Sequence, residues 1–123
     1  MNQTRIGTEL DRMAAHPGIV GCALVDAQTG LVWDSRGGAA HAVRVWEAAV
    51  DYWRLHDRQK LQFSGLGMLG AAVMYHTGGV LAVFPCCSDP EVLFVAHGQH
   101  RGVDWIALQR MARELGELLR RSG

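Results

Sequence analysis

The chain has 123 residues, of which 49% are hydrophobic and 20% charged, a composition typical of one globular domain over residues 1–123. Twelve basic residues balance twelve acidic ones, so the surplus of positive charge that nucleic-acid binding requires is missing. No apolar run approaches the roughly 20 residues of a membrane span, and residues 1–11 lack the apolar core of a signal peptide. The three cysteines are an odd number, whereas disulfide frameworks of secreted proteins usually contain pairs, so the sequence predicts a cytoplasmic protein with reduced thiols. The charge balance and the lack of a long apolar run predict that neither nucleic acid nor a membrane is a partner.

The first half of the chain predicts two helices separated by two strands. Residues 2–15 have an apolar side at helical spacing and are followed by Pro17 and Gly18, which stop the helix. The apolar run 19–25 has the length of a strand, and a hairpin loop over 26–30 leads into a second strand over 31–35. Gly37 and Gly38 then precede a long helix over 39–58.

Three strands and a last helix are predicted beyond Lys60. A glycine-rich strand lies within 63–76, with 71–75 as its firmest part. A tight hairpin over 77–79 connects it to a strand over 80–84 that ends at Pro85. A turn over 88–90 leads into a fifth strand over 92–96, and a one-sided amphipathic helix follows over 103–120. The order α-β-β-α-β-β-β-α with hairpin connections predicts an α+β domain in which helices cover a five-stranded, mainly antiparallel sheet.

The long helix over 39–58 is apolar around far more than one face. One stripe at i, i+3, i+4 and i+7 spacing contains Ala42, Val43, Trp46, Ala49, Val50 and Trp53. A second stripe beside it contains Val45, Ala48, Tyr52 and Leu55. A helix packed on a single sheet needs an apolar arc of only about 100°. We therefore expect the second stripe to contact another molecule, and a second copy of this chain is the simplest candidate.

Several short segments, taken in their order and spacing, carry a family resemblance. The segment HPGIVG over 16–21 leads into Leu24, Val25 and Asp26, the segment TGLV follows over 29–32, and Gly102 precedes the last, Leu- and Arg-rich helix. Over nearly the whole chain these segments resemble the Roadblock/LC7 family, the profilin-like domains of dynein light chains and bacterial GTPase regulators. The resemblance implies homodimers in which the middle helices pair and the third strands join two sheets into one of ten strands.

Carried over by position, the resemblance also implies which residues meet the partner. On the middle helix they are Val45, Ala48, Tyr52 and Leu55, and on the edge strand they are Ala71, Val73 and Tyr75. The helix residues are those of the second apolar stripe, which was found from the helical spacing alone.

Two groups of residues have side chains suited to metal or redox chemistry. Cys86 and Cys87, expected in the loop between the fourth and fifth strands, could form a redox pair or half of a metal site, or be two small residues at a turn. One rim of the sheet is expected to carry His76, His97 and His100, with His16 near it. These histidines could bind zinc, sense pH, or remain solvated loop residues. Neither group completes a metal motif, and we predict no metal or cofactor.

No arrangement typical of an enzyme is visible in the sequence. None of the serines lies in a GxSxG segment. Residues 65–70 have the letters of a GxGxxG motif but lack the preceding strand, the following helix and the later acidic residue with which that motif binds dinucleotides. The sequence therefore predicts a protein that is not an enzyme.

Two functions of different classes remain. The first is a non-catalytic, homodimeric interaction platform that regulates or scaffolds a small Ras-like GTPase or a related cytoplasmic partner. The alternative is a small-molecule-binding sensory domain of PAS or profilin-like architecture. In the alternative, Trp33, Trp46, Trp53 and Trp105 would line a pocket of several hundred Å³ instead of filling the core and an interface.

Overall fold

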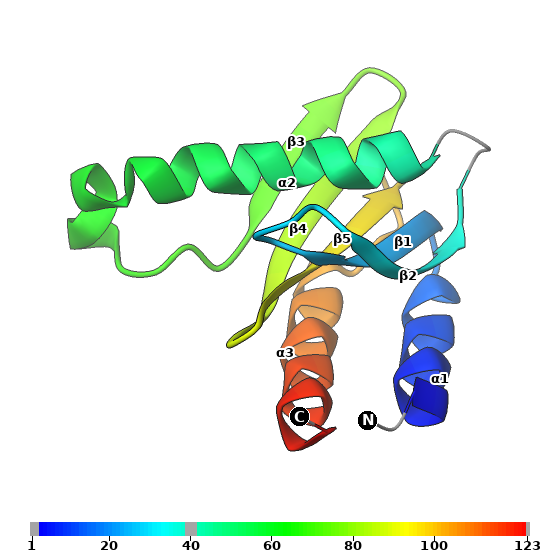
Figure 1. Ribbon diagram of the computed structural model, residues 1–123. Helices are drawn as coiled ribbons and strands as arrows, with labels where there is room; N and C mark the ends of the chain where they lie inside the picture. The colour runs from blue at the N-terminus through cyan, green and yellow to red at the C-terminus, as the bar shows by residue number, and fades with distance from the viewer. Residues whose placement is uncertain (1–2, 39–41, 123) are drawn as a thin grey trace.

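A five-stranded sheet separates two layers of helices in the computed structural model, which describes residues 3–38 and 42–122 (Figure 1). In chain order the elements are α1 (Gln3–Ala14), β1 (Ile19–Asp26), β2 (Val32–Gly37), α2 (Ala42–Arg58), the 3-10 helix η1 (Lys60–Leu66), β3 (Ala72–His76), β4 (Gly79–Ser88), β5 (Glu91–Gly98) and α3 (Trp105–Ser122). The predicted α+β class and order of the helices and strands are thus confirmed. The predicted start of the middle helix at Ala39 lies outside the described residues. Within the described ranges, no helix is long and apolar enough to cross a membrane.

The strands follow the order β2-β1-β5-β4-β3 across the sheet. All four neighbouring pairs are antiparallel, as the hairpin connections predicted. The last strand in the sequence, β5, therefore occupies the centre of the sheet. Within the described chain, β2 and β3 are the edge strands, each paired on one side only.

Successive side chains of each strand point to opposite faces of the sheet, and this divides the core into two layers. On β1, Ala23 and Val25 pack with α2, whereas Cys22 and Leu24 pack with α1 and α3 on the opposite face (Figure 1). The α2 layer contains fully buried Trp46, a side chain whose burial contributes on the order of 1.5–3 kcal/mol or more. Each layer therefore has its own apolar cluster, and the sheet carries one on each face.

Arg54 connects α2 to the turn between β1 and β2. Its Nε donates to the carbonyl oxygen of Ala27 at 2.9 Å, and its Nη2 donates to that of Gln28 at 2.7 Å. A third donor, Nη1, bonds to Asp51 one turn back along the helix at 3.2 Å. The guanidinium thus satisfies two carbonyls that the turn itself leaves unpaired.

The predicted end of the fourth strand at Pro85 is wrong, because β4 continues to Ser88. Pro85 lies beyond Val83, the last residue of β4 that pairs with β3, and next to a bulge in the β4–β5 ladder. Edge positions and bulges are the places where a sheet tolerates a residue without an N–H donor. As a result Cys86 and Cys87 lie on β4 and not in the loop predicted for them.

The third strand lies within the predicted segment 63–76 and nearly matches its firmest part, 71–75, but the glycine-rich first part of that segment is not a strand. β3 occupies only the end of the predicted segment, and η1 occupies most of the first part. Gly67, with φ of +80°, follows η1 in a conformation that other residues rarely adopt. Ala71, predicted on the edge strand, lies just before β3 and packs towards the α1–α3 layer.

Candidate interaction surface

The helix α2 presents one apolar stripe to the sheet and a second one on its flank, beside the β3–β4 hairpin. Trp46, Ala49, Val50 and Trp53 are buried against the sheet. We call Val45, Ala48, Tyr52 and Leu55 the outer stripe. Within it Val45 is half-buried, Ala48 and Leu55 are exposed, and Tyr52 is 50% exposed. The prediction that α2 carries more apolar surface than its own sheet covers is therefore confirmed.

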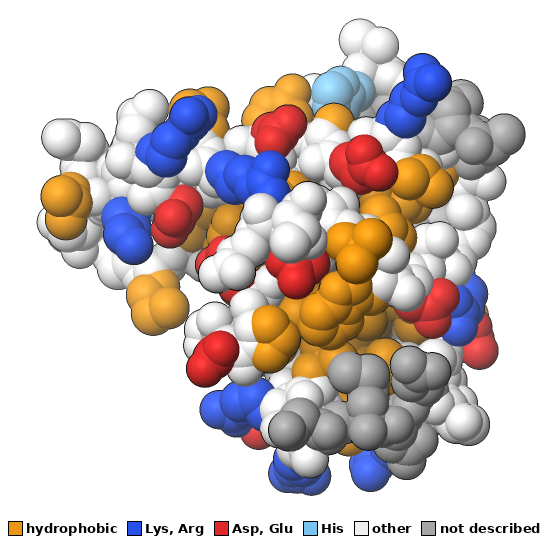
Figure 2. Space-filling model, in the orientation of Figure 1, with side chains coloured by type: hydrophobic (Ala, Val, Ile, Leu, Met, Phe, Trp, Pro, Cys, Tyr) orange, Lys and Arg blue, Asp and Glu red, His pale blue; other side chains and the backbone are white. Residues whose placement is uncertain are grey.

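Val43 departs from the predicted pattern. It was expected in the stripe that faces the sheet, yet it is exposed. It lies in the first turn of α2 and at the border of the buried stripe, where the neighbouring Ala42 makes the contact with the core instead. Figure 2 shows Lys, Arg, Asp and Glu side chains gathered along α2 on the face of the molecule seen there.

The residues predicted on the third strand do not share a face with α2. Ala72 and Met74 pack on the α2 layer, so Val73 and Tyr75, which alternate with them, point to the opposite face of the sheet. Both are exposed, Tyr75 by 72%. The structure therefore places the outer stripe and these two side chains on opposite faces, with the unpaired backbone edge of β3 between them.

A further exposed apolar segment follows α2 and was not expected. Leu61, Leu66 and Met68 project from η1 and the following loop, Met68 being 97% exposed. Phe63 stacks on His56 of α2, with ring centroids 4.9 Å apart. The density of large apolar residues over 61–69 is a sequence signal for this surface, whereas the glycines at 65, 67 and 70 had suggested a flexible entry to the third strand.

A cleft of about 460 Å³ separates the outer stripe from the β3–β4 hairpin. Val45, Ala48 and Tyr52 line one wall, and His76 and His97 line the other. The structure thus brings two of the predicted rim histidines together. The ring Nε2 of His100 lies 2.6 Å from the backbone carbonyl oxygen of His76. In the parts of the chain that the structure describes, no three His, Cys, Asp or Glu side chains are grouped so as to hold a metal ion.

The cysteines lie in surroundings that disfavour thiolate chemistry. Cys86 is the additional residue of the β4–β5 bulge, and its backbone lies against Gly116 of α3. Burial raises the pKa of the Cys86 thiol far above its ordinary value and raises that of Cys87 as well. Burial also raises the pKa of Cys22 to about 12. All three thiols are free, and their raised pKa values keep them protonated and weakly nucleophilic near neutral pH.

The four tryptophans do not line a common pocket. Trp46 and Trp53 belong to the α2 layer, whereas Trp33 and Trp105 pack against the α1–α3 layer on the other side of the sheet. The interpretation of a single four-tryptophan pocket is therefore wrong, because β-strand alternation and the sheet itself separate the two pairs.

Comparison with known proteins gives the family of folds to which this arrangement is similar. No protein-family model matches the sequence, and no curated protein matches it either. Among solved structures, a Roadblock/LC7 domain from Streptomyces avermitilis superimposes with a TM-score of 0.74 at 17% identity, covering 94% of each chain. MglB from Myxococcus xanthus gives 0.81 at 15% identity, covering 98% of this chain and 99% of that one.

A third solved structure, described as MglB with a tetrameric arrangement, gives a TM-score of 0.77 at 14% identity and covers 98% of this chain and 91% of that one. In all three the similarity extends over nearly the whole length of both chains. At such low identities the similarity concerns the fold and leaves activity and partners open. The chain has the Roadblock/LC7 fold.

Proposed function

We propose that the chain is a non-catalytic interaction platform that forms a homodimer through the outer stripe of α2 and the free edge of β3. In this role it regulates or scaffolds a small Ras-like GTPase or a related cytoplasmic protein. The observation that carries the proposal is the outer stripe, an apolar surface at regular helical spacing that is half-buried at Val45 but exposed at Ala48, Tyr52 and Leu55.

Self-association suits this surface for three physical reasons. A two-fold axis beside α2 would set the outer stripe against its own copy, so that a single apolar pattern serves both partners. The backbone groups on the free edge of β3 would gain hydrogen-bond partners from a second β3. With twelve basic and twelve acidic residues, the two copies would carry no net charge that repels them at a distance.

The protein partner is inferred from the resemblance of the sequence and from the structural comparisons. The resemblance to Roadblock/LC7 domains includes bacterial GTPase regulators. The similar solved structures include MglB, in one case described with a tetrameric arrangement. In a homodimer, the two α2 helices would form one broad surface on which such a partner could dock.

Light scattering coupled to size exclusion tests the homodimer. The expected result at micromolar concentration is twice the chain mass of 13.5 kDa. A monomer at that concentration would remove the homodimer from the proposal. Hydrogen exchange would then locate the contact, since pairing of two edge strands protects the outward-facing amides of β3 and leaves those of the other edge, β2, unprotected.

Affinity capture from a native lysate tests the partner. The chain serves as bait in two parallel captures, one with a non-hydrolysable GTP analogue added to the lysate and one with GDP. Recovery of one small GTPase that differs between the two nucleotides, identified by mass spectrometry, is the expected result. Recovery of the bait chain alone would refute GTPase regulation and leave self-association standing. A Tyr52→Asp bait separates partners that need the dimer from those that bind each protomer alone.

A further inference from the structure

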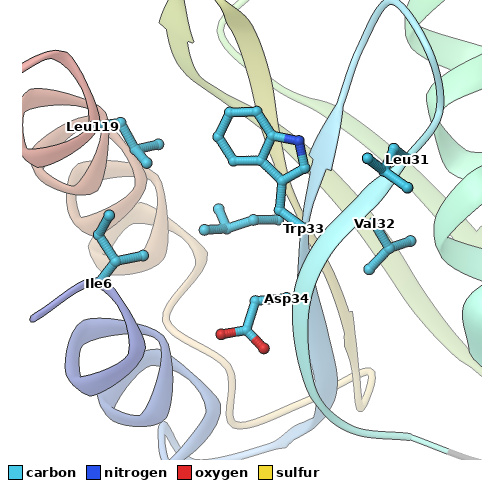
Figure 3. A pocket seen from close by; sticks show the side chains of 7 residues that line it. Ile6, Leu31, Val32, Trp33, Asp34 and Leu119 are labelled. Carbon is cyan, nitrogen blue, oxygen red and sulfur yellow. The ribbon is translucent and has the colours of Figure 1, made fainter. Parts of the chain in front are cut away.

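A pocket of about 560 Å³ opens between α1, α3 and β2, on the face of the sheet opposite α2 (Figure 3). Its size is that of pockets that hold small organic molecules. The apolar lining includes Ile6 of α1, Leu119 of α3, Leu24 of β1 and the indole ring of Trp33. Figure 2 shows the apolar side chains that gather there, over β2 and between the two helices.

A β-bulge directs two consecutive side chains of β2 into this pocket. Leu24 of β1 pairs with Asp34, and its neighbour Val25 pairs with Val32, so Trp33 is the additional residue between the two pairs. Successive side chains of a regular strand point to opposite faces, but a bulge changes this direction locally. Figure 3 accordingly shows the indole of Trp33 and the carboxylate of Asp34 on the same side of β2, facing α1 and α3.

The Asp34 carboxylate is fixed by donors on one of its oxygens. Its Oδ1 accepts hydrogen bonds from the Arg36 Nη1 at 2.6 Å and from the backbone N–H of Ser35 at 2.9 Å. Within the described residues, the hydrogen bonds to this carboxylate all go to Oδ1, and Oδ2 is left for a further donor.

Asp34 belongs to an ion-paired group of three side chains that carries a net negative charge. The guanidinium of Arg36 is shared between Asp34 and Asp11, which it contacts through Nε. The two carboxylates raise the pKa of Arg36, so it stays charged, and the three groups together carry one net negative charge. Among the side chains that line the pocket, Asp34 is the charged one.

We propose that this pocket binds a small organic cation, a protonated amine carried on an aromatic or branched aliphatic body. The ammonium group lies at Asp34 Oδ2, where the carboxylate attracts it, and the organic body extends along β2 towards the Trp33 indole. The apolar body replaces water against Ile6, Leu24 and Leu119. An organic acid is disfavoured by the same net negative charge, and a neutral molecule gains only the apolar contacts.

The test is a titration of the full ¹⁵N-labelled chain with three compounds that share one phenylalkyl body: 2-phenylethylamine, 2-phenylethanol and 3-phenylpropanoate. The readout is the indole Nε1–H resonance of Trp33, assigned by its disappearance in Trp33→Phe. We expect a saturable shift with millimolar amine, and an affinity at least about tenfold higher for the amine than for the alcohol or the acid.

Asp34→Asn, which keeps the shape of the side chain, should weaken amine binding by about tenfold. The matched control, Asp51→Asn on the exposed side of α2, should leave it unchanged. Equal binding of the three compounds, no saturable shift with the amine, or unchanged binding by Asp34→Asn would each overturn the proposal. Because the pocket and the outer stripe lie on opposite faces of the sheet, each of these results is independent of whether the chain dimerises.

Discussion

Replacement of Tyr52 by aspartate perturbs the proposed dimer surface while leaving the protomer core unchanged. Tyr52 lies at the middle of the outer stripe, one helical turn from Ala48 and from Leu55. Its side chain is 50% exposed in the single chain and takes no part in either apolar cluster of the core. In a separated protomer the new carboxylate would simply face water.

The magnitude follows from the area that Tyr52 still exposes. A tyrosine has roughly 200 Å² to bury, so about 100 Å² remains available to a partner. At about 25 cal/mol per Å² this corresponds to about 2.5 kcal/mol for one protomer and, because a two-fold axis repeats every contact, to about 5 kcal/mol for the dimer. The dissociation constant should therefore rise by about three to four orders of magnitude, and more if the carboxylates are buried without a partner.

Sedimentation equilibrium across the micromolar range measures this change directly. The matched control is Ile106→Asp, which also places aspartate at an exposed apolar position of a helix, but on α3 and on the other face of the sheet. Ile106 is 80% exposed, so this variant should fold and assemble as the wild type does. Far-ultraviolet circular dichroism of both variants establishes that the protomer is intact.

A Tyr52→Asp chain that assembles as tightly as the wild type would refute the assignment of the outer stripe to the contact. If Ile106→Asp separated the copies instead, the contact would lie on the α1–α3 side of the molecule. A Tyr52→Asp chain that is monomeric but unfolded would be replaced by Tyr52→Ser, which removes the apolar area without adding a charge. That variant should also weaken the dimer, by the area contribution alone.

Three further predictions concern stability, measured by urea denaturation at one fixed protein concentration because self-association would add to the apparent value. A Cβ at Gly116 would lie 1.7 Å from the carbonyl oxygen of Cys86, so Gly116→Ala should cost at least about 3 kcal/mol. In α1, a Cβ at Gly7 would lie 3.3 Å from the end of the Arg36 side chain, so Gly7→Ala should be tolerated and should stabilise by up to about 1 kcal/mol. If the two variants had the same effect on stability, α3 would be able to shift away from β4. Burial raises the pKa of Cys22 to about 12, so only the unfolded chain releases this proton between about pH 8.5 and 12. In that range Cys22 should lower the free energy of unfolding by up to about 1.4 kcal/mol per pH unit, and the stability of Cys22→Ala should fall less steeply by this amount. Arg54→Ala removes two hydrogen bonds to backbone carbonyls and should cost about 1–3 kcal/mol, and an unchanged stability would mean that water satisfies those carbonyls equally well.

The order of the helices and strands and the two apolar stripes of α2 could be predicted because both depend on the spacing of apolar residues within short segments. Apolar residues at i, i+3, i+4 and i+7 mark Trp46, Val50 and Trp53 as one stripe whatever the sheet does. Tyr52 falls outside that stripe for the same reason. The surplus of apolar area on one helix is thus visible before any tertiary contact is known.

The errors concern features that depend on distant parts of the chain. A proline ends a strand that is paired on both sides, because it lacks the N–H donor that one neighbour needs. At Pro85, however, β4 no longer pairs with β3, so the strand can continue. The sequence near Pro85 does not show where the pairing with β3 ends. The bulge that turns Trp33 and Asp34 towards the same pocket likewise depends on the register with β1, so the sequence could place Trp33 on a strand but could not assign it a face. The pocket itself needs α1 and α3, from opposite ends of the chain, to lie side by side.

The central position of β5 has a consequence for how the protein is made. β1 is the first strand to leave the ribosome, but one of its edges pairs with β5, joining Ile19 to Gly98 near one end of the ladder and Asp26 to Val92 at the other. Until the segment 91–98 has been synthesised, β1 and β4 each lack a neighbour and both apolar layers lack their middle strand. Pairing over so long a sequence separation is slow, and it leaves unpaired edges open to other chains in the meantime. We expect nascent chains that stop before β5 to depend on chaperones, and chains extended through α3 to fold without them.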